Sequence, residues 1–173
     1  MSVVSNNSIS LAGEFAVLSQ LALRGYDANM TLGRTKSVDI LVSNPANGKM
    51  YQLEVKTNYR NTRNQPSESK VHGKTLSGWM MSKKHETITA TNLFYCFVNI
   101  SKNTSMFKFY IVPSKVVAQY VREEHALWLS VKKKEGKVKE TDMWLFRIGS
   151  RSEKYTIPTP VAERYENNWK FAG

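Results

Sequence analysis

Acidic residues are scarce in this sequence of 173 residues. It contains 14 Asp and Glu but 25 Lys and Arg, which gives a formal net charge of +11. A surface with this excess of positive charge suits a polyanionic partner. Nucleic acid is the first such partner to consider, although an anionic membrane surface carries charge of the same sign.

Cysteine and long apolar runs are scarce as well. The only cysteine, Cys96, excludes an internal disulfide framework and any zinc site built on several cysteines. Because it lies in the apolar run 93–100, we expect a buried, inert thiol. No run approaches the eighteen or so apolar residues that span a bilayer, and residues 1–10 are polar and uncharged. We therefore expect a soluble, cytoplasmic protein.

The pattern of apolar residues predicts a mixture of helices and strands. Ser10 is the expected N-cap of a first helix, whose apolar residues recur at helical spacing until Gly25 ends it. The inward positions of this helix are expected to be Leu11, Phe15, Leu18 and Ala22.

The segments after this helix read mainly as strands. The turn-rich stretch 43–48 predicts that its two flanking strands form an antiparallel hairpin. In the stretch 58–78 the apolar residues follow neither the alternation of a strand nor the spacing of a helix. We therefore expect an irregular loop there. The expected strands are 26–32, 37–42, 50–57, 93–100, 106–112 and 144–148, and further helices are expected from 113–114 onward and over 161–171. The length favours a single domain, residues 1–173, of the α/β or α+β class.

One of these strands carries polar residues on a single face. Alternation over residues 51–57 places Gln52, Glu54 and Lys56 on one face and apolar residues on the other. A half-solvated strand alternates in the same way, so this spacing has an ordinary structural explanation too.

Two further acids are expected near this strand. Asp39 lies between Val38 and Ile40 in the partner strand of the hairpin, where a carboxylate is costly unless it is hydrogen-bonded or bound to a metal. Glu14 falls on or beside the inward stripe of the first helix. It is not part of a capping box, because position 11 is Leu and not Ser or Thr.

This arrangement resembles the PD-(D/E)xK nuclease superfamily over residues 10–58. In order and spacing it is similar to archaeal-type Holliday junction resolvases, whose first helix also supplies a glutamate. Val38 stands where the proline of the motif is usually found. The resemblance implies a restriction-endonuclease-like α/β core with a central mixed sheet of four to five strands flanked by helices, in the order αβββαβ. The core would span 10–114, with a C-terminal addition at 115–173.

The same resemblance implies a chemistry for these residues. Asp39 and Glu54, with Glu14, would be the metal-binding acids, Lys56 the lysine of the motif, and Gln52 an additional site residue. Mg²⁺, for which Mn²⁺ can substitute, would bind the scissile phosphate and acidify a coordinated water. Lys56 would stabilise the charge or orient the water. The implied partner is DNA, and relatives that cut both strands often act as homodimers.

A basic segment follows the motif strand. Residues 56–84 contain seven basic residues against Glu68 alone, and backbone phosphates are the usual partners of such clusters. A solvated loop is the alternative. In the same stretch, Tyr59 and Trp79 are candidates for stacking on bases, Trp79 more plausibly for packing. The basic residues are Lys56, Arg60, Arg63, Lys70, Lys74, Lys83 and Lys84.

Three functions are compatible with these observations. The first is a divalent-metal-dependent DNA endonuclease. The second is a nucleic-acid-binding module of the same fold without catalysis, and the third is an interaction or immunity protein of a mobile element. Fold resemblance by itself does not choose the substrate.

Overall fold

The computed structural model describes residues 4–31, 38–60, 67–69, 72–136, 142–150 and 157–171. The chain forms two compact units, each made from separate stretches of sequence. The first contains residues Met1–Thr62, Ala90–Pro113 and Tyr165–Gly173. The second contains Arg63–Thr89 and Ser114–Arg164. A single domain over 1–173 stays a prediction.

The first unit is built on a five-stranded mixed sheet in the order β1-β2-β3-β6-β7. Only β3 and β6 run parallel, and the other neighbours are antiparallel. The predicted α/β class with a central mixed sheet and flanking helices is confirmed, as are both predicted hairpins. The strands are β1 (Asp27–Met30), β2 (Ile40–Asn44), β3 (Lys49–Arg60), β6 (Leu93–Ser101) and β7 (Phe107–Pro113).

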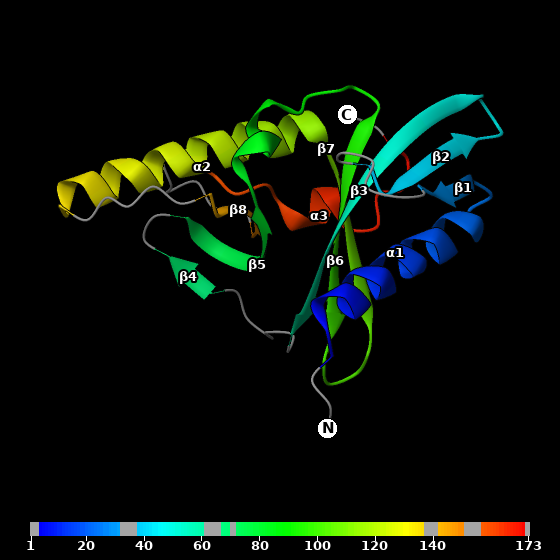
Figure 1. Cartoon of the computed structure of the whole chain (residues 1–173), viewed down its shortest axis with the longest axis horizontal. Helices are drawn as coiled ribbons and strands as arrows, with labels where there is room; N and C mark the ends of the chain where they lie inside the picture. The colour runs from blue at the N-terminus through cyan, green and yellow to red at the C-terminus, as the bar shows by residue number, and fades with distance from the viewer. Residues whose placement is uncertain are drawn as a thin grey trace. The chain divides into compact units, whose positions relative to one another are not determined.

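Helix α1 (Asn6–Ala22) packs on this sheet, mainly against β3 (Figure 1). It begins five residues before the predicted start, because the Ser5 side chain accepts a hydrogen bond from the backbone N–H of Ser8 and caps the helix in place of Ser10.

The predicted inward stripe of α1 was wrong in part, because Leu18 packs against the core but Leu11, Phe15 and Ala22 do not. Leu11 and Phe15 are exposed, whereas Gly13, Val17 and Leu21 are buried. The reason is that glycine at position 13 lets the helix approach the Thr57 side chain of β3, which sets the rotation of the helix.

The end of the chain completes the apolar core of the first unit. Phe171 stacks on Tyr51 of β3 at a centroid distance of 4.7 Å and meets Tyr26 edge-on at 5.4 Å. Trp169 is buried in the same core, and its backbone carbonyl accepts a hydrogen bond from the Tyr26 hydroxyl. The core includes Leu53 and Val55 of β3. One face of β3 is therefore committed to packing.

The second unit contains a three-stranded antiparallel sheet in the order β4-β5-β8. Its core includes Trp79 of β5, which is a packing residue as expected, and Phe146 of β8. An ion pair of 2.6 Å joins the half-buried Arg147 to the buried Glu124. The elements are β4 (Ser67–Ser69), β5 (Gly73–Met81), the 3₁₀ helix η1 (Lys83–Thr87), α2 (Ser114–Lys134), β8 (Trp144–Gly149) and α3 (Ala162–Tyr165).

Three predictions about elements were wrong. The stretch 58–78 is not irregular throughout, because β3 continues to Arg60 and β5 begins at Gly73. The helix expected over 161–171 is only α3, four residues long. Between β3 and β6 the expected order has an α-helix, but the described residues there form β4, β5 and η1. None of the described helices is long and apolar enough to cross a membrane.

The contact between α1 and β3 predicts an unusual response to a helix-favouring substitution. A Cβ at position 13 would overlap the Thr57 hydroxyl. Gly→Ala within a helix gains about 1 kcal/mol from propensity, but overpacking costs about 1–3 kcal/mol. We therefore expect Gly13→Ala to lower the free energy of unfolding measured by urea denaturation.

The matched control is the double variant Gly13→Ala/Thr57→Ala. It removes the overlapping hydroxyl, so a double-mutant cycle should show a favourable coupling of at least about 1 kcal/mol. A Gly13→Ala protein more stable than the wild type would contradict the close approach.

Candidate active site

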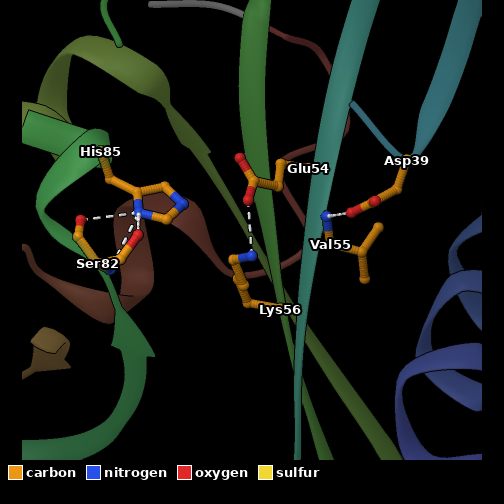
Figure 2. A network of polar contacts seen from close by, with 6 residues as sticks. All are labelled: Asp39, Glu54, Val55, Lys56, Ser82 and His85. Carbon is orange, nitrogen blue, oxygen red and sulfur yellow. Dashed lines mark hydrogen bonds and ion pairs between the residues drawn. The ribbon is translucent and has the colours of Figure 1, made fainter. Parts of the chain in front are cut away.

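Glu54 and Lys56 of β3 form an ion pair on the face of the sheet opposite the Leu53–Val55 core. The Lys56 Nζ lies 2.6 Å from the Glu54 Oε1, and the two side chains point toward one another (Figure 2). The Glu54 side chain is 3% exposed and that of Lys56 is 28% exposed. A carboxylate buried to this degree needs a partner that offsets its lost hydration. The predicted convergence of these two residues is confirmed.

Asp39 lies at the point where β2 separates from β3. It precedes β2 by one residue, so the expectation of a mid-strand aspartate was wrong. The backbone N–H of Asp39 donates to the Leu53 carbonyl at 2.8 Å, and its Oδ2 accepts from the backbone N–H of Val55 at 2.7 Å. The carboxylate thus takes the place of a strand carbonyl, and in Figure 2 it meets the Val55 N–H from the other side of the β3 ribbon than the Glu54–Lys56 pair.

The Glu14 carboxyl of α1 feels the charges of Asp39 and Lys56. Burial raises the pKa of its carboxyl first, and the negative charge of Asp39 raises it further, while Lys56 acts in the opposite direction. Glu14 is half-buried and follows the buried Gly13 directly in the helix. Glu14, Asp39 and Lys56 are therefore close enough to interact electrostatically, whereas α1 packs on the face of β3 opposite to Glu54.

Sequence reasoning missed Tyr95 of β6. The parallel register pairs Glu54 with Tyr95 and Lys56 with Phe97, so both aromatic rings lie on the face of the ion pair. Burial and then the charge of Glu54 raise the pKa of Tyr95, so its phenol stays protonated. A hydroxyl-bearing side chain in the apolar run 93–98 was the available signal, but the strand that pairs with β3 was not known.

The other predicted site residues are only partly brought together. Gln52 is half-buried and lies two residues before Glu54 on β3, so the two side chains share one face of the strand. Of the basic residues, Arg60 ends β3 in the first unit, whereas Lys74, Lys83 and Lys84 are exposed in the second unit. Arg63 and Lys70 lie outside the described residues.

The acids have the chemical character of a site for a hard divalent cation. Carboxylate oxygens are the ligands that Mg²⁺ takes, and it commonly uses one or two of them with water and a substrate phosphate. Among the described residues, no three Asp, Glu, His or Cys side chains lie close enough to enclose a metal by themselves. The donor set therefore fits an open site of one or two carboxylates, completed by substrate and water.

Comparisons with known proteins give little further information. No family model matches the sequence, and no curated protein matches it. Among solved structures, the chain is similar to a bacterial homing endonuclease, I-Ssp6803I. The two share 11% identity over 96% of this chain and 90% of that chain, with a TM-score of 0.47. At this level the likeness carries no argument about activity.

The raised pKa of Glu14 predicts a pH-dependent stability. The folded protein holds the Glu14 proton more tightly than the unfolded chain does. The resulting stability is present below the ordinary glutamate pKa and is lost as the pH rises through the raised value. With metal removed by EDTA, Glu14→Gln should therefore be more stable than the wild type at pH 7, and the difference should shrink near pH 4.

Urea denaturation at the two pH values checks this, with the exposed Glu163→Gln as the control. If Glu14→Gln and Glu163→Gln change stability equally at both pH values, the folded protein does not raise the pKa of the Glu14 carboxyl.

Proposed function

We propose that this protein is a divalent-metal-dependent nuclease of the PD-(D/E)xK type that hydrolyses DNA phosphodiester bonds. The observation that supports it most is the buried Glu54 carboxylate paired with Lys56 at 2.6 Å, with the Asp39 carboxylate fixed on the intervening residue of the same strand. A buried ion pair is weak as a stabilising device, because desolvation offsets its attraction. A role in chemistry explains its presence better.

In this proposal, Asp39 and Glu54 would hold Mg²⁺ or Mn²⁺, with Glu14 as the third acid. When bound, the ion supplies a Lewis acid for the phosphate and lowers the pKa of a coordinated water. The Val55 N–H fixes the orientation of the Asp39 carboxylate. Lys56 brings a cation, oriented by Glu54, to the place where negative charge develops on the phosphate.

The charge of the chain supports DNA as the substrate. The formal net charge is +11, and an excess of this size gives sequence-independent affinity for a phosphate backbone. Exposed Arg60 lies on the same strand as Lys56, on the same face by alternation. Substrate can therefore meet positive charge beside the acids.

One observation favours a second candidate function, a nucleic-acid-binding module without catalysis. Both Glu54 and Asp39 are engaged by protein groups, Lys56 and the Val55 N–H, and no cluster of three metal-ligating side chains occurs in the described ranges. A protein of this kind would bind DNA with or without a divalent ion.

The proposed activity predicts that isosteric changes at the site abolish cleavage. We expect the wild type to cut plasmid or branched DNA with Mg²⁺ or Mn²⁺ and not with EDTA. Asp39→Asn, Glu54→Gln and Lys56→Met should each lower the rate by at least about a hundredfold, as is typical when one preorganised electrostatic group is lost. Gel-based cleavage rates measure this.

Lys49→Met is the matched control, because Lys49 is exposed at the opposite end of β3. It should cut at the wild-type rate. Equal cleavage by all variants would expose a contaminating nuclease, and a pure protein that binds DNA but cuts with neither metal would establish the second candidate.

Metal binding by itself gives a separate prediction. Because an ion that binds only the folded state stabilises it, Mn²⁺ at ten times its Kd should raise the free energy of unfolding by about 1.4 kcal/mol. Titration calorimetry and thermal unfolding should show this for the wild type and for Lys49→Met. Asp39→Asn should show none of it, and an identical Mn²⁺ response in Asp39→Asn would remove Asp39 from the metal site.

A further inference from the structure

Polar residues continue along β3 beyond the ion pair and cross to the next two strands. Asn58 and Arg60 follow Lys56 on the same face of β3 by alternation. The register pairs Asn58 with Asn99 of β6, and Asn99 with Lys108 of β7. Lys56, Asn58, Arg60, Asn99 and Lys108, which we call the polar row, therefore share one face of three adjacent strands.

The two asparagines in the polar row are unusual for their position. Parallel strand pairs usually consist of continuous apolar residues, and asparagine is depleted in strands. Here the Asn58 Nδ2 lies 3.3 Å from the Asn99 Oδ1, and both side chains are half-buried. Two residues earlier along both strands, on the same face, Lys56 of β3 is paired with the aromatic Phe97 of β6. The change from apolar to amide side chains coincides with greater exposure on this face, because Phe97 is buried, Asn58 and Asn99 are half-buried and Lys108 is exposed.

Two cations lie at the ends of the polar row. Arg60 is exposed at the end of β3. The Lys108 side chain is 53% exposed, and its Nζ lies 3.8 Å from the Glu166 Oε1, whose side chain is 35% exposed. An exposed ion pair of this length contributes little energy and can be exchanged for another anion.

We propose that the polar row binds the sugar-phosphate backbone of DNA on one side of the bond to be cut, with a phosphate displacing Glu166 from Lys108. This inference rests on the proposed nuclease function, since it takes Lys56 as the end of the row at the scissile phosphate. Amide and guanidinium donors contact phosphates without reading the base sequence. The row thus provides position and affinity, not sequence preference.

The dimensions agree with this role. Strand residues rise by about 3.3 Å, so Lys56 and Arg60 are separated by about 13 Å along β3. One DNA strand carries a phosphate about every 3.4 Å of helix axis, and successive phosphates also turn about that axis, so the row is long enough to reach one or two phosphates beside the scissile one. Lys108 extends the contact sideways across the sheet.

The test measures binding separately from cleavage. A fluorescein-labelled 30-base-pair duplex is titrated in EDTA between 50 and 400 mM NaCl with the wild type, Arg60→Gln, Lys108→Gln, Glu166→Gln and the control Lys49→Gln. Arg60→Gln and Lys108→Gln should each reduce the salt slope by about 0.9 and weaken binding about tenfold at 50 mM NaCl.

Glu166→Gln should act in the opposite direction. It releases Lys108 from its carboxylate partner, so binding should tighten by about twofold to fivefold. Asn99→Asp, which adds a negative charge with almost no change of shape, should weaken binding more than Asn99→Ala. Lys49→Gln should leave the slope unchanged, and thermal unfolding checks that each variant is folded.

The outcomes separate the two proposals. If the wild type cuts DNA but Arg60→Gln and Lys108→Gln keep its salt slope, the polar row is wrong and the nuclease proposal stands. Reduced slopes in a protein that never cuts would support the row and overturn the activity. A wild type that does not bind the duplex at 50 mM NaCl would overturn both.

Discussion

The pairing of β3 with a different kind of neighbour on each side is the constraint on which the candidate site depends. On one side, β2 is antiparallel and separates from β3 at Asp39, which leaves the Val55 N–H to the Asp39 carboxylate. On the other side, β6 is parallel and places Tyr95 opposite Glu54. The acids of the site therefore take their positions from backbone hydrogen bonds, which hold them more firmly than side-chain packing on a loop would.

One face of β3 is apolar and packs in the core, whereas the other carries a buried ion pair. Leu53 and Val55 face the core beneath α1, where burial of apolar surface stabilises the unit by about 25 cal/mol per Å². Glu54 and Lys56 face the other way, where a buried charge must be offset by its partner. A shift of one residue in register would exchange the two sets, so the apolar face fixes the position of the polar one.

Local pattern was enough to predict the strands of the five-stranded sheet, both hairpins and the pairing of Glu54 with Lys56, because strand alternation is a property of a few consecutive residues. It did not predict β4 and β5, which lie in the stretch expected to be a loop. It was not enough for the rotation of α1, which depends on the approach of Gly13 to Thr57 in a distant strand. The proximity of Tyr95 to Glu54 could not be predicted for the same reason, since only the register of β3 with β6 shows it. Asp39 was expected within a strand, and only the separation of β2 from β3 shows why its carboxylate replaces a carbonyl.

The position of Phe171 has a consequence for the order in which this protein folds during synthesis. Its ring completes the aromatic cluster with Tyr51 and Tyr26, residues that leave the ribosome more than a hundred residues earlier. The strand pair β3–β6 also has to wait while the intervening stretch emerges. Contacts so distant in sequence slow folding, because the entropy of closing long loops is lost before they form. The nascent sheet therefore keeps an uncovered aromatic edge until residues 169–171 have been synthesised, and association with other chains is its main hazard during that period.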